Sequence, residues 1–148
     1  MLPIMDNNRE FETAVTELLL VIGQLLRRLR AVSNTRKLTW SQVAIMARLE
    51  ESGPMTTADL ARAEAVKPQS MGQTLAQMEV EGFVERRPHP GDGRQILFAL
   101  TEDGQELRLK VGLAKHEWLM AAFAKLKPEE QQSFVSAVEL IRKMSDYD

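Results

Sequence analysis

Residues 56–100 read TTADLARAEAVKPQSMGQTLAQMEVEGFVERRPHPGDGRQILFAL. This stretch predicts a short helix, a tight turn, a second helix from Pro68, and a two-stranded hairpin with strands over 83–87 and 95–100. That order is typical of a winged helix-turn-helix, in which the second helix enters the DNA major groove and the hairpin tip reaches the minor groove. A small α+β core without a ligand has the same order, so the side chains must decide between the two.

The helix predicted from Pro68 carries different chemistry on its two sides. Met71, Leu75 and Met78 recur at helical spacing and predict a buried face. The opposite side is uncharged and rich in hydrogen-bonding groups, whereas a merely solvated face more often carries Lys and Glu. Glutamine bonds adenine in a bidentate way, and serine bonds either kind of base edge. The candidate DNA-contacting residues here are Lys67, Pro68, Gln69, Ser70, Gln73, Thr74 and Gln77.

The hairpin tip, residues 88–94, contains prolines and glycines and no apolar side chain to bury. A narrow minor groove attracts inserted arginine through its negative potential. We expect Asp92, two residues from Arg94, to hold that side chain in position. The alternative is an ordinary exposed turn with a local ion pair, which contributes little. The candidate DNA-contacting residues of the hairpin are Arg86, Arg87, His89, Asp92 and Arg94.

Helix ends are marked by local signals. Thr39 and Gln42 have the spacing of a capping box. Gly82 is expected to end the helix from Pro68, with Phe83 and Met78 in Schellman contact. Ala65 lies in the predicted tight turn, where a left-handed backbone costs it roughly 1 kcal/mol. Thr56 is expected to cap a further helix start, and Thr56 and Thr57 are candidate phosphate contacts.

The flanking segments predict long amphipathic helices. A helix over 8–33 carries an apolar stripe, and two more follow over 101–126 and from Pro128. One recognition helix reads only a few base pairs, so two copies are normally needed. We therefore expect a mainly α fold of about six helices with a small β-hairpin wing. Its parts are an N-terminal dimerisation helix (1–35), a DNA-binding lobe (36–100) and C-terminal dimerisation helices (101–148).

Composition limits the possible functions. Residues 36–100 carry eight basic and eight acidic side chains, so any DNA surface depends on how the charges are arranged. That neutrality supports an alternative, a winged-helix protein-interaction module without specific DNA binding. Cysteine is absent, as are a signal peptide and a long apolar run, and we expect a cytoplasmic protein without membrane association.

The sequence shows no set of residues spaced for catalysis. No nucleophile–base set or phosphate loop is visible, and we expect no enzyme activity, catalytic residue, metal or cofactor. Trp40 is a weak candidate for a pocket that binds an aromatic ligand, although a core or interface anchor explains it more simply.

Three motifs carry a family resemblance. They are L-A-x(4)-V-x-P-x-S from Leu60, L-x-x-M-E-x-x-G-F-V-x-R from Leu75, and D-G-R-x(5)-L-T-E-x-G from Asp92. Together with the flanking helices they resemble the MarR family of bacterial regulators over nearly the whole chain. The resemblance implies a homodimeric winged helix that binds pseudo-palindromic double-stranded operators and usually represses.

The resemblance also implies roles for particular residues. Gln69, Ser70, Gln73 and Thr74 would face the major groove, and Arg94 would enter the minor groove paired with Asp92. A small aromatic or phenolic effector would bind between the DNA lobe and the dimer lobe. Three positions depart from the family pattern: Ala65 replaces a common glycine, Gln73 an occasional arginine, and Gly93 a frequent basic residue. The last two remove positive charge, so we expect weaker or more salt-sensitive DNA binding.

Overall fold

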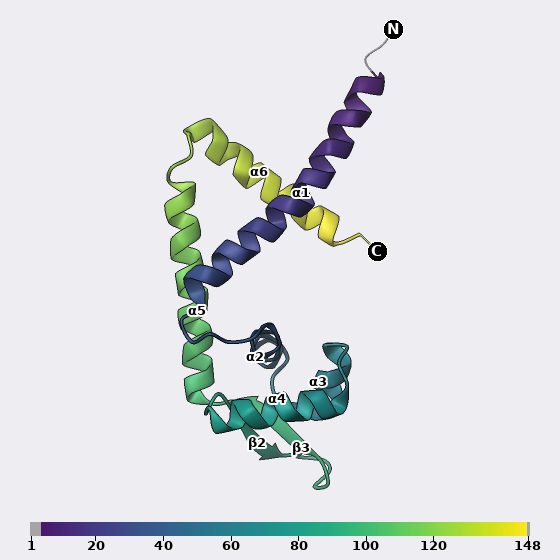
Figure 1. Ribbon diagram of the computed structural model, residues 1–148, viewed down its shortest axis with the longest axis vertical. Coiled ribbons are helices and arrows are strands. Elements are labelled where there is room, and N and C mark those ends of the chain that lie inside the picture. The colour runs from purple at the N-terminus through teal and green to yellow at the C-terminus, as the bar shows by residue number, and fades with distance from the viewer. Residues whose placement is uncertain (1–3, 148) are drawn as a thin grey trace. The chain divides into compact units, whose positions relative to one another are not determined.

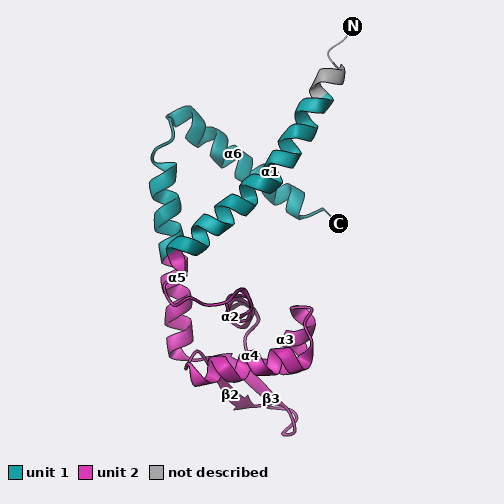
Figure 2. Cartoon of the chain, in the orientation of Figure 1, with its two compact units in different colours: residues 1–32, 114–148 teal, residues 33–113 magenta. Residues whose placement is uncertain are grey.

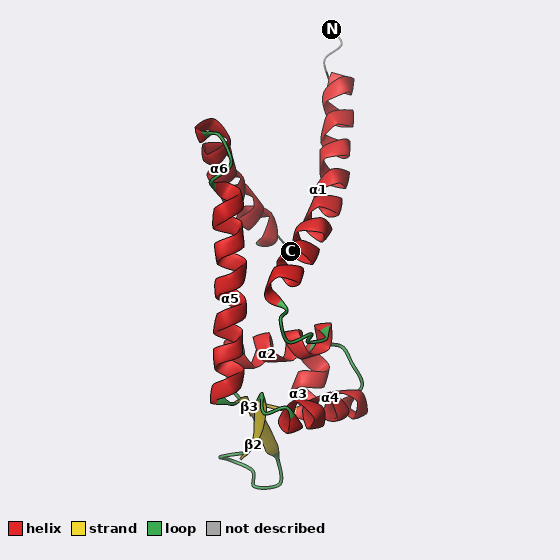
Figure 3. Cartoon of the chain, turned by 60° about the vertical axis from the view of Figure 1, so that its left-hand side comes forward, coloured by secondary structure: helices red, strands yellow, loops and turns green. Residues whose placement is uncertain are grey.

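A computed structural model of the chain describes residues 4–147, with side chains from residue 8 (Figure 1). The order along the chain is α1 (Ile4–Ser33), α2 (Trp40–Ser52), β1 (Met55–Thr56), α3 (Thr57–Ala63), α4 (Pro68–Val80), β2 (Val84–Pro88), β3 (Ile96–Leu100), α5 (Glu102–Phe123) and α6 (Pro128–Ser145). Figure 3 shows helices dominating and the strands confined to one small sheet. The predicted mainly α winged helix-turn-helix is confirmed.

The chain divides into two compact units (Figure 2). One is residues 33–113, which holds α2, α3, α4, the sheet and the first half of α5. The other joins residues 1–32 to 114–148, and so holds α1, the second half of α5 and α6. None of the helices within 4–147 is long and apolar enough to cross a membrane.

The sheet has three antiparallel strands in the order β1-β3-β2, so the predicted two-stranded hairpin was incomplete. β2 pairs with β3 from Val84↔Leu100 to Pro88↔Ile96, within one residue of the predicted bounds. β1 adds Met55↔Phe98 on the other edge of β3. Two residues are too few to show alternation, and β1 exists only because the tertiary fold brings it beside β3.

The core of the 33–113 unit lies where α2, α3 and α4 pack on the sheet. Met46, Leu60, Leu75 and Met78 are completely buried, one or two from each of these three helices. Burial of such a side chain contributes roughly 1.5–3 kcal/mol, so α4 is fixed to the unit by its inner face. Its outer face is left for other contacts.

The predicted helix ends are formed as expected. The Thr39 hydroxyl accepts from the Gln42 amide at 3.2 Å, and the Gln42 side chain accepts from the Thr39 amide at 2.9 Å. At the end of α4, Gly82 has φ +82°, and the Phe83 amide donates to the Met78 carbonyl at 3.0 Å. Both are the patterns that the residue types predict.

The turn between α3 and α4 is closed by Ala65 in the left-handed region, with φ +52°. The Val66 amide donates to the Ala61 carbonyl at 3.0 Å and the Ala65 amide to Arg62 at 3.3 Å, which together make a Schellman motif. Alanine holds this conformation at a cost of roughly 1–2 kcal/mol, which the buried neighbours Leu60 and Ala61 offset.

The start of α5 is tied to the end of α4. The Thr101 hydroxyl accepts a hydrogen bond from the Gly104 backbone amide at 3.0 Å and donates one to the Gly82 carbonyl. The Thr101 backbone amide donates to the Phe83 carbonyl at 3.1 Å. Gly104 is buried so closely here that an added Cβ would lie 2.2 Å from the Phe83 carbonyl oxygen. The glycine is therefore required by close approach rather than by a special backbone angle.

Candidate nucleic-acid interface

The two faces of α4 differ as predicted. Met71, Leu75 and Met78 are buried, whereas most of the candidate DNA-contacting residues are exposed. Exposed are Lys67, Pro68, Gln69, Ser70, Gln73 and Gln77, and Thr74 is half-buried. Pro68 occupies the first turn and no side chain caps the helix there, so its first N–H groups are open to an anion.

Two side chains of this outer face already have partners. The Thr74 hydroxyl donates to the Ser70 carbonyl at 3.1 Å. The side-chain amide of Gln77 donates to the Glu81 carboxylate at 3.0 Å. The same carboxylate accepts from the side-chain amide of buried Gln42 on α2 at 3.3 Å. Sequence reasoning missed this Gln42–Glu81–Gln77 connection, because its ends are far apart in the chain and no spacing rule joins them.

The arginines of the wing, the β2–β3 hairpin with its loop, are not equivalent. Arg86 pairs with Glu79 of α4 at 3.0 Å and lies 5.4 Å over the Phe98 ring, and Arg87 pairs with Glu85 at 2.7 Å. Arg94 is exposed and its guanidinium has no partner among residues 8–147. Within that described part of the chain, Arg94 is therefore the uncompensated arginine of the wing.

Asp92 does not hold the Arg94 side chain as expected. Its carboxylate accepts from the Arg94 backbone amide at 3.0 Å instead. A two-residue spacing suits this short Asx-type bond better than a pair between side chains. His89 is half-buried, with its ring against the backbone of the same loop.

The start of α3 serves its own helix. The Thr56 hydroxyl accepts from the Asp59 amide at 3.1 Å, as a cap should. The Asp59 carboxylate turns to Arg62, 3.0 Å away, and does not complete a reciprocal pair. Thr56 and Thr57 are half-buried, and their contact with phosphate remains a prediction.

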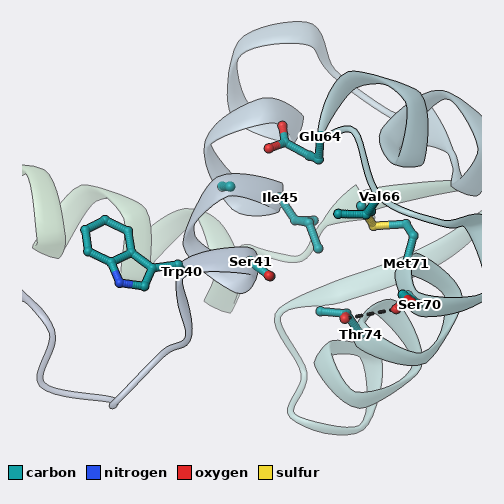
Figure 4. Close-up of a pocket in the computed structure, with 9 residues that line it drawn as sticks. Trp40, Ser41, Ile45, Glu64, Val66, Ser70, Met71 and Thr74 are labelled. Carbon is teal, nitrogen blue, oxygen red and sulfur yellow. Dashed lines mark hydrogen bonds between the residues drawn. The ribbon is translucent and has the colours of Figure 1, made fainter.

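Trp40 begins α2 and is 62% exposed, so it is not a core anchor of this chain. It lies at the edge of a pocket of about 250 Å³ (Figure 4). The pocket lies between α2, the α3–α4 turn and the first half of α4. Its lining residues are Trp40, Ser41, Ala44, Ile45, Glu64, Val66, Ser70, Met71 and Thr74.

The terminal helices leave apolar side chains uncovered. On α1 the predicted stripe is exposed, with Val15 at 58% and Leu19 at 70%. On α6 none of the residues is buried, and Phe134, Leu140 and Met144 are all exposed. Apolar surface of this extent is typical of a protein–protein contact.

Two further observations concern the charged side chains. Among the described residues, no group of three His, Asp or Glu side chains is placed to hold a metal. The pKa of Glu106 is lowered by the hydrogen bond from Lys110 and then by the charge of Lys110, 2.9 Å away. This exposed pair on one helix face is an ordinary surface interaction.

The short helix, the turn, the exposed second helix and the wing hairpin define a winged helix-turn-helix protein. Residues 38–96 match the family model described as MarR family. The chain belongs to the MarR family.

Similar proteins agree with this assignment. An uncharacterized HTH-type transcriptional regulator of Mycobacterium bovis, Mb0904, is 36% identical over 131 residues, covering 88% of this chain and 92% of that protein. The HTH-type transcriptional repressor NicR of Pseudomonas putida is 28% identical over 112 residues, covering 76% and 69%.

Solved structures share the fold. A transcriptional regulator protein from Pseudomonas aeruginosa superposes with a TM-score of 0.82 at 22% identity, covering 95% of this chain and 99% of that one. A mutant of S. aureus MepR, bound to an oligodeoxyribonucleotide, has a TM-score of 0.71 at 15% identity, covering 90% and 98%. By its family and by its 36% identity to an HTH-type transcriptional regulator, this chain is a DNA-binding transcriptional regulator.

Proposed function

We propose that this chain is a repressor that binds a pseudo-palindromic operator as a homodimer, with α4 in the major groove and the wing in the adjacent minor groove. The observation that carries the proposal is the uncharged outer face of α4. Gln69 and Gln73 are exposed, and no described residue bonds their side-chain amides. Side-chain amides that are free in this way can bond the edges of bases and so distinguish one base pair from another.

Contacts with the DNA backbone would come from cations of this face that have no acidic partner among the described residues. Lys67 precedes the uncapped N-terminus of α4, where backbone N–H groups and the helix dipole favour phosphate. Arg94 extends from the wing loop without a partner for its guanidinium among the described residues, as minor-groove insertion requires. These groups hold the protein in register, and the glutamine face supplies the sequence preference.

Homodimerisation is supported by the exposed apolar side chains of α1 and α6. Two copies related by a two-fold axis would cover the same surface on each other and present two recognition helices. The half-sites should then lie about 10 base pairs apart, centre to centre.

The test of DNA recognition is selection of bound sequences from random duplexes, followed by fluorescence anisotropy at several salt concentrations. We expect an enriched inverted repeat and an affinity that falls steeply with salt. Absence of both enrichment and salt dependence would favour the protein-interaction module instead.

The dimer is tested by light scattering of two charged variants of α1. Val15→Glu places a carboxylate on the apolar stripe and is expected to give monomers. Thr13→Glu is the matched control, because it lies on the opposite side of the same helix at 3.6 residues per turn. If both variants had the mass of a dimer, the α1 stripe would be excluded from the dimer interface.

An effector is proposed for the Trp40 pocket. Ile45, Val66 and Met71 supply an apolar lining, and Ser70 and Thr74 add hydroxyls from α4. A volume of about 250 Å³ is near the lower end of the range for ligand sites, and suits a single aromatic ring with a polar substituent. Because Ser70 and Thr74 also belong to the proposed DNA face, such a ligand would bind differently to free and DNA-bound protein.

The chain's two tryptophans allow a clean test of this site. Trp118→Phe leaves Trp40 as the fluorescent residue, and Trp40→Phe leaves Trp118. Titration with phenol or benzoate should change the fluorescence of the first variant alone and release operator DNA from it. A response of Trp118 only would place the effector elsewhere.

A further inference from the structure

The loop between β2 and β3 is organised by one ring nitrogen. His89 Nδ1 accepts hydrogen bonds from the backbone amides of Gly91 and Asp92, each 3.0 Å away. The ring lies close along the loop, since a Cβ on Gly91 would lie 3.5 Å from His89 Cε1. His89 therefore does for this loop what an Asx side chain does for a turn: it satisfies the amides two and three residues ahead.

A second set of hydrogen bonds connects Asp92 to the backbone of Arg94 and Gln95. The Asp92 carbonyl accepts from the Gln95 amide at 3.0 Å, and the His89 amide donates to the Gln95 carbonyl at 3.3 Å. The Asp92 carboxylate accepts from the Arg94 amide at 3.0 Å. His89 fixes Asp92, and Asp92 fixes the backbone from which the unpaired arginine extends.

We propose that His89 is a positioning residue of the wing, whose neutral ring shapes the loop and sets the direction of Arg94, and that it is not a cationic contact with DNA. The proposal rests on the proposed function, in which Arg94 enters the minor groove. A neutral imidazole with its proton on Nε2 has a free lone pair on Nδ1, whereas an imidazolium carries N–H groups on both nitrogens. Protonation therefore removes the acceptor from two loop amides at once.

The charged surroundings do not change this reasoning. The hairpin carries Glu85, Arg86 and Arg87 on β2 and Asp92 and Arg94 in its loop, and Glu79 lies on α4, which packs against β2. Glu79 and Glu85 are paired with the two β2 arginines. The two remaining charges of this set, Asp92 and Arg94, are opposite in sign.

The two roles of His89 predict opposite effects of acidification. A cationic contact would strengthen operator binding as the ring gains a proton, because another positive charge would face phosphate. A loop acceptor would weaken binding, because the wing loses its form. Operator binding measured at neutral and at mildly acidic pH therefore distinguishes the two roles.

The experiment compares His89→Asn with His89→Gln. The Asn side-chain oxygen occupies nearly the place of Nδ1, whereas the Gln oxygen reaches nearer to the place of Nε2. We expect His89→Asn to keep operator affinity within about threefold and His89→Gln to lose about tenfold, since each lost loop bond contributes modestly. The affinity of the natural protein, taken as a ratio to that of His89→Asn at each pH, should fall on acidification.

A second measurement needs no DNA. Amide hydrogen exchange at Gly91 and Asp92 in the free protein should be slow in the natural chain and in His89→Asn, and faster in His89→Gln. Nitrogen NMR of the imidazole, assigned with a His116→Gln variant, should show an unprotonated Nδ1 at neutral pH. His116 is the other histidine of the chain.

Either of two results would overturn the proposal: an affinity ratio that rises on acidification, or equal exchange rates in the Asn and Gln variants. Failure of the proposed function is distinguishable from both. If Arg94→Ala binds operator like the natural protein, the wing does not contact DNA, while the exchange and NMR data still decide how His89 acts within the loop.

Discussion

Gly104→Ala tests the close contact between the start of α5 and the end of α4. An added Cβ would lie 2.2 Å from the Phe83 carbonyl oxygen and 3.3 Å from Leu100 Cδ2. The first of these atoms belongs to the backbone and cannot rotate away. The helix must therefore move by about 1 Å to restore an ordinary contact distance.

The cost follows from what that movement breaks. Overpacking of a core site costs typically 1–3 kcal/mol. The Thr101 amide bond to Phe83, 3.1 Å long, would stretch beyond useful length, a further loss of roughly 0.5–1.5 kcal/mol. Replacing glycine within a helix returns about 0.5–1 kcal/mol. We expect a net loss of about 2 kcal/mol in the free energy of unfolding.

The assay is thermal and denaturant unfolding at one fixed protein concentration, because association shifts apparent stability. For a chain of this size the loss corresponds to a fall in Tm of roughly 4–8 °C. Gly112→Ala is the matched control, since it lies in the same helix and an added Cβ there meets nothing within 4 Å. It should stabilise the protein by roughly 0.5–1 kcal/mol.

The two substitutions should therefore change the free energy of unfolding in opposite directions: Gly104→Ala should lower it and Gly112→Ala should raise it. If Gly104→Ala were as stable as the natural chain, α5 would not approach Phe83 as closely as described. If both substitutions destabilised equally, the effect would belong to the helix in general and not to the contact.

Three other predictions concern the wing, the outer face of α4 and the α3–α4 turn. Arg94→Ala should lower operator affinity and reduce the salt slope by about 0.9, whereas Arg87→Ala, which removes a residue already paired with Glu85, should change the slope less; equal slopes would refute the distinction. Gln73→Ala should relax base preference at one operator position by about 1–3 kcal/mol in repeated site selection, and a uniform loss on every sequence would contradict base reading. Ala65→Gly should raise the free energy of unfolding by roughly 0.5–1 kcal/mol, because the strain that it relieves, roughly 1–2 kcal/mol, exceeds the roughly 0.5–1 kcal/mol of extra conformational entropy that glycine loses on folding; unchanged or lower stability would count against that strain.

Local features could be predicted from the sequence because their physics is local. The capping box at Thr39 and the Schellman end at Gly82 depend on residues within one turn, and the spacing alone specifies the partners. The inner face of α4 was predictable for the same reason, since helical periodicity decides which side chains point together.

Contacts between distant segments could not be predicted in this way. β1 is formed by pairing with β3, which comes much later in the chain, and its two residues carry no pattern of their own. The Arg86–Glu79 pair and the Gln42–Glu81 bond join different elements. For Asp92 the sequence predicts the right partner residue, Arg94, but the wrong group of that residue. A spacing of two permits a bond either to the backbone amide or to the side chain, and the structure has the bond to the backbone amide. The roles of the DNA-contacting residues stay predictions until binding is measured.

The pairing of Arg86 and Arg87 with glutamates bears on how the protein finds its operator within a chromosome. Non-operator DNA holds a protein almost entirely through uncompensated cations, and a chromosome offers on the order of 10⁶ or more such competing positions. A wing in which two arginines are already neutralised, on a chain of net charge −2, forgoes much of that indiscriminate attraction. Fewer molecules would then be held on non-operator DNA, so a smaller cellular pool would suffice to occupy an operator of the proposed kind.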